Sequence, residues 1–298
     1  MRNELTIFEK NTALYDERNF AARIEAIEHI EFNIIDRIDG VLEKAPLPEE
    51  LIALRQDAER VKRQLESVDD ASFRRLRENI RMGRCTGPAL KDHIDECVGC
   101  GPGGMRRNDE PGYDNLDAFI SGLLLTEPPP AETMPREPEM VFYQPTPARI
   151  IFQFLEKALL TADDVLIDVG SGLGHVPIMG NLLSGAKATG IEFEPAYCDY
   201  ARACAIDLNL KRVEFVNIDA RAADYSGGTV FFMYTPFTGK LLEDVLEELR
   251  RESLRRQIRL FTYGPCTPEV CRHSWLTRED QDGDRIYTLG AFRSSGAL

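Results

Sequence analysis

Basic side chains and long apolar runs are both scarce in this sequence of 298 residues. Its 36 lysines and arginines stand against 50 aspartates and glutamates, so the formal net charge is −14. Because nucleic-acid binding depends on basic side chains that neutralise phosphates, this balance argues against a nucleic-acid partner. The longest apolar runs, such as residues 120–125, fall far short of the roughly 18 residues that a transmembrane helix needs. No membrane span is therefore expected.

Export signals are also missing from the sequence. The first six residues, Met-Arg-Asn-Glu-Leu-Thr, have no apolar stretch of the kind that secretory signals carry. Without such a signal, seven cysteines in a chain of this size argue against a disulfide framework. We therefore expect a cytoplasmic protein. Nothing in the sequence indicates an oligomeric state.

A proline-rich segment divides the chain into two parts of different charge. Residues 127–138 contain five prolines, which cannot donate the hydrogen bonds of helices or strands. Residues 1–140 carry 19 basic and 29 acidic side chains, a balance of −10, whereas residues 141–298 carry 17 and 21, a balance of −4. We predict an N-terminal domain at residues 1–126, an extended linker at 127–140 and a second domain at 141–298.

Apolar residues at helical spacing run through the first domain. Between Phe20 and Ile38 they recur every three or four positions, and this stripe ends at Gly40. A second helix is expected to start near Pro48 and continue past Leu65, and a third to cover residues 71–82. The first domain is therefore predicted to be all-helical.

The second domain alternates short apolar strands with helices. Strands are expected at residues 165–169, 188–191, 213–218, 230–234 and 258–263, with helices at 147–160, 176–183, 196–208 and 240–254. Two final strands, within 274–278 and 285–293, form an antiparallel hairpin. The pattern predicts an α/β fold: a seven-stranded, mostly parallel, Rossmann-like sheet with an antiparallel C-terminal hairpin.

The most informative segment is the glycine-rich turn after the first of these strands, Asp-Val-Gly-Ser-Gly-Leu-Gly at residues 168–174. Glycines in such a turn let the backbone approach a ligand closely. The dinucleotide fingerprint would need a further glycine where His175 stands, and no Gly-Lys-Ser/Thr follows to make a phosphate-binding P-loop. The spacing that remains is Asp-x-Gly-x-Gly-x-Gly.

In this turn and the segments after it, residues 142–298 resemble the class I S-adenosylmethionine (SAM)-dependent methyltransferases. The resemblance implies SAM as cofactor, with Glu192 on the two ribose hydroxyls, and Asp219 and the backbone N–H of Ala220 near the adenine amino group. It also implies cofactor contacts in the turn itself, at Asp168, Gly170, Ser171, Gly172 and Gly174. A Tyr-x-Pro-Thr-Pro segment, which lies over the methionine end of SAM in similar enzymes, adds Tyr143 and Thr146.

The loop after the fourth strand is expected to form the acceptor pocket, with Tyr234, Thr235, Pro236 and Phe237. Enzymes that methylate base amines carry Asn/Asp-Pro-Pro-Tyr/Phe there, and only Pro236 and Phe237 match, which argues against a base amine. The cofactor loops are also similar to those of Dot1-like protein-lysine methyltransferases. Tyr234 is the candidate catalytic residue.

The function expected from these features is methyl transfer to an unidentified acceptor, either a protein side chain or a small molecule, with the helical domain covering the acceptor pocket. Two alternatives remain open from the sequence. One is a protein that binds SAM or S-adenosylhomocysteine without turnover. The other is a different α/β enzyme that uses a nucleotide.

Four potential zinc ligands lie close together in the first domain: Cys85, His93, Cys97 and Cys100. Thiolate and imidazole ligands of this number suit a closed tetrahedral site. We therefore consider a structural zinc ion that stabilises the helical domain, with an unligated loop as the alternative.

Overall fold

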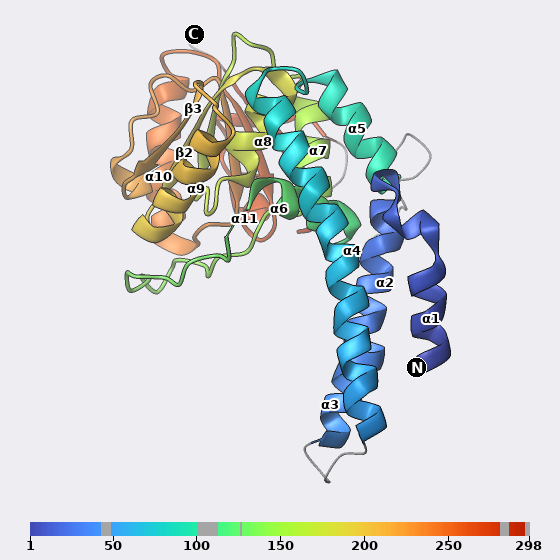
Figure 1. The fold of residues 1–298 in the computed structure, drawn as a ribbon. Coiled ribbons are helices and arrows are strands. Elements are labelled where there is room, and N and C mark those ends of the chain that lie inside the picture. Colours follow the sequence, from blue (N-terminus) through green and yellow to red (C-terminus); the bar gives the residue numbers. More distant parts are fainter. Residues whose placement is uncertain (43–48, 100–112, 126, 281–285, 296–298) are drawn as a thin grey trace. The chain divides into compact units, whose positions relative to one another are not determined.

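A computed structural model of the chain describes residues 1–42, 49–99, 113–125, 127–280 and 286–295 (Figure 1). The chain contacts divide it into two compact units. The first comprises residues 1–85, 91–108 and 114–123, and the second comprises residues 86–90, 109–113 and 124–298. In the described part of the chain, no helix is both long enough and apolar enough to cross a bilayer.

Helices make up the described part of the chain before residue 125. They are α1 (Arg2–Lys10), α2 (Phe20–Ile30), α3 (Asp36–Leu42), α4 (Glu49–Arg81), α5 (Pro88–Val98) and α6 (Asn115–Leu124), with two short 3-10 turns at Thr12–Tyr15 and Glu17–Asn19 and a π-helical turn at Glu31–Ile35. The predicted second and third helices are one continuous helix, α4. Its apolar face, from Leu54 to Leu65, packs with the isoleucines of the predicted stripe in a single core.

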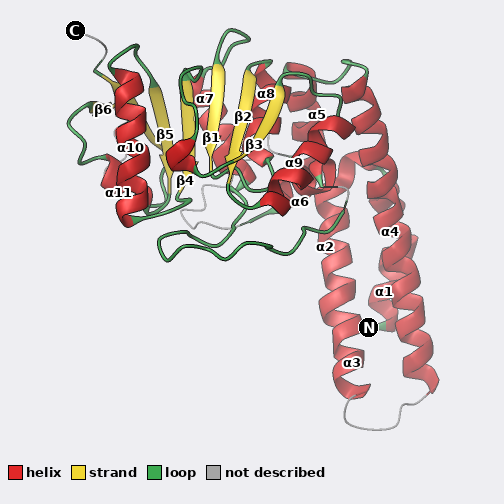
Figure 2. Cartoon of the chain, turned by 90° about the vertical axis from the view of Figure 1, so that its left-hand side faces the viewer, coloured by secondary structure: helices red, strands yellow, loops and turns green. Residues whose placement is uncertain are grey.

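The second unit is built on a seven-stranded sheet. Its strands are β1 (Val165–Val169), β2 (Lys187–Glu192), β3 (Val213–Asn217), β4 (Val230–Tyr234), β5 (Arg259–Tyr263), β6 (Leu276–Arg278) and β7 (Gly290–Ser294). The order across the sheet is β3-β2-β1-β4-β5-β7-β6, and Figure 2 shows the first five of these strands side by side. Only β7 runs in the opposite direction, because its pairings with β5 and with β6 are antiparallel. The predicted fold class, including the antiparallel hairpin at the end, is confirmed.

Helices cover both faces of this sheet. On one face Phe154 of α7 (Ala148–Ala158) contacts Phe232 and Phe261, and α8 (His175–Ser184) and α9 (Pro195–Asp207) share that face. On the other face α10 (Gly239–Ser253) and α11 (Cys266–Val270) pack on side chains of β1, β4 and β5 in one apolar core. In the sheet β1 lies between β2 and β4, so the chain adds strands first on one side of β1 and then on its other side. A crevice is therefore expected at the carboxyl ends of β1 and β4.

Residues 128–141, which we call the strap, lie in the second unit and form no helix or regular strand. Near its start, the backbone N–H groups of Thr133 and Met134 both donate to Oε2 of Glu194 at 2.9 Å. The Thr133 hydroxyl donates to the other carboxylate oxygen. The sequence predicted an extended linker here, and the structure describes an extended segment that is bonded to the sheet's own loops.

The end of the strap is bonded to the loop after β4. The N–H of Val141 donates to the Pro236 carbonyl at 3.0 Å, and Met140 and Phe237 form an isolated antiparallel bridge. The Glu139 carboxylate accepts from the N–H of Leu241 in the first turn of α10 at 2.7 Å. The strap is thus held at both ends, on the β2 side and on the β4 side of the crevice.

Candidate functional site

A cavity of about 270 Å³ opens at the carboxyl ends of the parallel strands, under the strap. Each of the first four strands contributes the residues that follow it, so the cavity occupies the crevice that the sheet topology predicts. Its lining includes ten of the residues expected from the sequence: Tyr143, Gly170, Gly172, Glu192, Asp219, Ala220, Tyr234, Thr235, Pro236 and Phe237.

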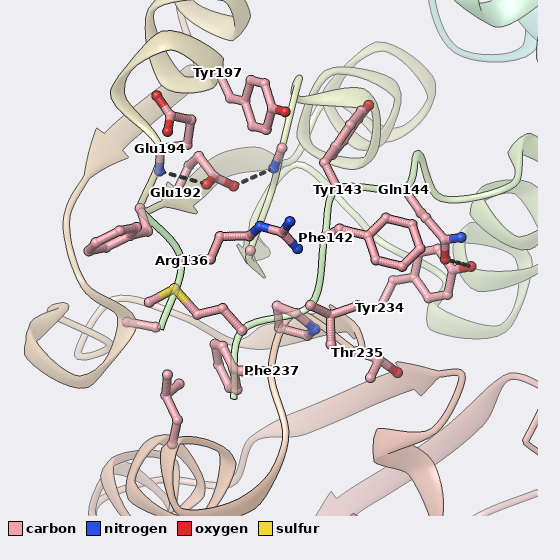
Figure 3. A pocket seen from close by; sticks show the side chains of 18 of the residues that line it. Arg136, Phe142, Tyr143, Gln144, Glu192, Glu194, Tyr197, Tyr234, Thr235 and Phe237 are labelled. Atoms are coloured by element: carbon pink, nitrogen blue, oxygen red, sulfur yellow. Dashed lines mark hydrogen bonds between the residues drawn. The ribbon is translucent and has the colours of Figure 1, made fainter. Parts of the chain in front are cut away.

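Glu192, the last residue of β2, presents its carboxylate to the cavity (Figure 3). Its Oε2 accepts from the N–H of Gly172 at 2.7 Å, and its Oε1 accepts from the N–H of Glu194 at 2.8 Å. Burial raises the pKa of this carboxyl above its ordinary value. Two backbone bonds therefore fix the carboxylate in place while both oxygens keep further acceptor capacity for ligand hydroxyls.

The glycines of the turn are required by close packing as well as by backbone conformation. Gly170 and Gly172 have φ values of +80° and +51°, where other residues are strained. A Cβ atom on Gly170 would lie 2.3 Å from Pro236, and one on Gly172 would lie 2.3 Å from the ring of Tyr143. The turn is therefore closely packed between the loop after β4 and the segment that follows the strap. Gly174 does not line the cavity; it makes room for Phe215.

The N–H groups of this turn are bonded within the protein. Those of Gly170 and Ser171 donate to the Ile191 carbonyl at 2.9 and 3.0 Å, and that of Gly174 donates to the Ser171 carbonyl at 2.9 Å. With the Gly172 N–H donating to Glu192, four amides that a phosphate group would need already have acceptors. The turn is therefore poorly suited to a pyrophosphate, which counts against a dinucleotide.

Asp168 lies behind the turn and is 3% exposed. Its carboxyl accepts no hydrogen bond from any described residue, and burial together with the nearby Glu192 raises its pKa well above the ordinary value. Ser171 Oγ and His175 Nε2 are also buried without a hydrogen-bond partner among the described residues. A buried carboxyl with no protein donor is suited to a cationic ligand group that approaches the turn.

Asp219 and Ala220 follow β3 and line the opposite end of the cavity. The Asp219 carboxylate accepts from the backbone N–H of Arg221 at 2.8 Å and from its guanidinium, and these bonds lower the pKa of Asp219. Arg221 also donates to Glu137 of the strap at 2.7 Å. Asp219 is therefore ionised and connects the β3 end of the cavity to the strap.

The loop after β4 has a strained backbone. Thr235 has φ +37°, which is unfavourable for a β-branched residue. Its buried hydroxyl donates to the Tyr263 carbonyl at 3.0 Å and accepts from the N–H of Cys266 at 3.1 Å. These bonds hold the strained conformation and set the direction of Tyr234, whose hydroxyl lies 3.4 Å from Oε1 of Gln144 (Figure 3).

Burial raises the pKa of Tyr234, so its phenol stays protonated at neutral pH. Tyr143 packs against Tyr197 with ring centroids 5.1 Å apart. Thr146, which was expected to contact the cofactor, is half-buried at the start of α7 and does not line the cavity.

Several cavity residues were not found from the sequence. Glu194 and Tyr197 come from the start of α9, Met134 and Arg136 from the strap, and Phe142 from the segment after it. The Glu194 side chain also accepts from the N–H of Ala196, which makes it the N-cap of α9, and Glu-Pro at a helix start could have indicated that role. No pattern in the sequence indicates that Glu194 also accepts hydrogen bonds from the strap.

The predicted zinc ligands are only partly described. Cys100 lies outside the described residues, and Cys97 Sγ lies 3.8 Å from Nε2 of His93. Burial raises the pKa of the Cys97 thiol to about 11, which opposes the thiolate form that zinc requires. Among the described residues, no three histidine, cysteine or acidic side chains come together to hold a metal ion.

No protein-family model matches the chain, and no curated protein matches it either. Among solved structures it is similar to an RNA methyltransferase from Salinibacter ruber in complex with S-adenosyl-L-homocysteine, with 26% identity over 51% of this chain and 92% of that one and a TM-score of 0.42. It is also similar to the putative methyltransferase YhhF from Escherichia coli (16% identity, 50% and 88% covered, TM-score 0.43). A third is a putative SAM-dependent methyltransferase from Methanococcus maripaludis (14% identity, 50% and 84% covered, TM-score 0.39). Because these TM-scores are below 0.5, the function assigned below depends on the site's own residues.

Proposed function

We propose that the chain is a SAM-dependent methyltransferase that binds the methyl donor in the cavity of its second unit. The observation that carries this proposal is the pairing of Glu192 with a glycine turn whose N–H groups are already bonded. A carboxylate at the end of β2 is suited to a ribose diol, while the turn offers little to a phosphate. A nucleoside without phosphates fits both features.

The charges around the turn support the same ligand. Asp168 lies buried behind the turn and does not itself line the cavity, and with no donor among the described residues its carboxyl suits the ammonium group of the donor's amino-acid part. Ile218 after β3, together with Phe237 and Leu241 after β4, gives the cavity the apolar walls that an adenine ring needs, and Asp219 also lines it. The residues present therefore fit an adenosyl amino acid along its whole length.

When bound, SAM would supply a methyl group on a sulfonium, whose carbon an acceptor would attack in line with the thioether as the leaving group. The chain's own contribution is to hold the donor, exclude water and align the acceptor. Tyr234, Thr235 and Phe237 line the cavity beside this position. With a protonated phenol, Tyr234 serves as a hydrogen-bond donor or contact surface for the acceptor and not as a base. We keep the prediction that the acceptor is a protein side chain or a small molecule. We also keep the prediction that the helical domain covers the acceptor pocket.

Isothermal titration of the full chain with SAM, S-adenosylhomocysteine and NAD tests the proposal. We expect both adenosyl ligands to bind and NAD not to bind. Glu192→Gln replaces one acceptor oxygen by a donor and should weaken both adenosyl ligands roughly tenfold to hundredfold. Binding of NAD alone would contradict the proposal, and transfer of labelled methyl groups to fractionated extracts would separate an enzyme from a binding protein.

A further inference from the structure

The described lining of the cavity contains four carboxylates and a single cationic side chain. The carboxylates are those of Glu132, Glu192, Glu194 and Asp219, and the cation is Arg136. Three of the four carboxylates accept hydrogen bonds from backbone N–H groups, and the fourth, that of Glu132, is paired with Arg136 itself. A lone guanidinium in such a site calls for an explanation, because it favours an anionic group in a cavity that otherwise favours cations.

Arg136 is held over the cavity by its neighbours in the strap. On one side Thr133 and Met134 are bonded to Glu194, and on the other Glu137 is paired with Arg221. Between these anchors the Arg136 side chain points into the cavity, between Glu192 and the loop that carries Phe237 (Figure 3). Its Nε lies 3.1 Å from Oε2 of Glu132, and no described residue accepts a hydrogen bond from its two terminal nitrogens.

The turn amides cannot serve an anion in place of Arg136, because Gly170, Ser171, Gly172 and Gly174 donate to protein acceptors. The proposed donor, however, brings a carboxylate into this cavity as part of its amino-acid end. We infer that Arg136 binds the α-carboxylate of the methyl donor through its terminal nitrogens. This inference rests on the proposed function and deepens it: the strap would recognise the amino-acid end of the donor.

The test compares two ligands that differ only in the amino-acid end. S-adenosylhomocysteine carries the carboxylate, and 5′-methylthioadenosine lacks it. In titrations of the full chain, Arg136→Gln should weaken S-adenosylhomocysteine roughly tenfold to hundredfold and change methylthioadenosine less than about twofold. Arg136→Lys, which keeps the charge but loses the forked geometry, should fall between. Arg250→Gln, on the exposed face of α10, is the matched control and should bind as the unaltered protein does.

A second variant separates ligand binding from a structural role in the strap. If Arg136 only held the strap through Glu132, then Glu132→Gln would weaken S-adenosylhomocysteine as much as Arg136→Gln does, and the inference would be overturned. If Arg136 binds the ligand, Glu132→Gln removes a competitor for the guanidinium and should leave that affinity unchanged or raise it. Unchanged affinity in Arg136→Gln, as expected of an arginine reserved for an anionic acceptor, also overturns it. Failure of the unaltered chain to bind either ligand would instead refute the proposed function.

Discussion

Glutamine at position 194 should release the strap without unfolding the sheet. In the structure, the Glu194 carboxylate accepts four hydrogen bonds, two from Thr133, one from Met134 and one from Ala196. A glutamine that keeps its carbonyl at the Oε1 position retains the bonds to the Thr133 hydroxyl and to Ala196. Its amide nitrogen then faces the two strap N–H groups, which lose their acceptor.

The magnitude follows from those two bonds. Hydrogen bonds to a charged acceptor contribute about 1.5–3 kcal/mol each, so the free energy of strap opening should fall by about 3 kcal/mol or more. That corresponds to opening about a hundredfold more often. Because these two bonds are absent from the unfolded chain as well, the free energy of global unfolding should fall by a similar amount, about 3 kcal/mol.

Native-state hydrogen exchange measures this directly at two amides. The N–H groups of Thr133 and Met134 should exchange about a hundredfold faster in Glu194→Gln, and the amides of β1, which exchange on global unfolding, should remain the more protected. Glu247→Gln, at an exposed ion pair on α10, removes the same charge and should leave the strap unchanged. If exchange at Thr133 and Met134 is the same in Glu194→Gln and in the unaltered chain, Glu194 does not hold the strap and the reasoning fails.

Two further predictions concern the turn and the carboxyl behind it. Gly172→Ala adds a methyl group 2.3 Å from the ring of Tyr143 at a positive φ, so it should weaken the binding of S-adenosylhomocysteine by at least about tenfold. The control Gly185→Ala also has a positive φ but has open surroundings, so it should lower the stability of the fold by about 1 kcal/mol and leave binding intact. Similar affinities for the two variants would argue against the close contact. Because the pKa of Asp168 is raised in the free protein, a cationic ligand that lowers it displaces a proton, and affinity should rise with pH from the ordinary carboxyl range up to the raised pKa. Titration calorimetry in buffers of different ionisation enthalpy should show proton release that is smaller in Asp168→Asn; equal release in both proteins would contradict the assignment.

The centre of the sheet was predictable because β1, β4 and β5 are short, apolar and almost fully buried. Expected bounds for β1 and β4 coincide with those of the structure. The prediction for the helical domain was less accurate between residues 65 and 71, where two separate helices were expected and the structure has the single helix α4. The helix continues because Asp69 pairs with Arg23, whose side chain is fully buried, at 2.7 Å. Periodicity cannot reveal such a partner 46 positions away.

The site divides in the same way. Gly170, Gly172, Glu192 and Asp219 were predictable because each follows a strand at the carboxyl edge of a parallel sheet, where position in sequence determines position in space. Arg136 was not, because prolines show that a segment is extended but not where it runs. The strap's course depends on carboxylates and amides far away in sequence, and these groups come within reach of the strap only after the sheet has formed.

The unequal charges around the cavity have a consequence for product release. SAM carries a net positive charge, and the thioether product formed after the methyl group leaves is neutral overall. A cavity lined by four carboxylates and one guanidinium, with Asp168 behind it, attracts the former more strongly than the latter. Salt screens this attraction over about 10 Å at 0.1 M. The ratio of donor affinity to product affinity should therefore be greatest at low ionic strength, so the same acidic lining that captures the donor also limits inhibition by the spent cofactor.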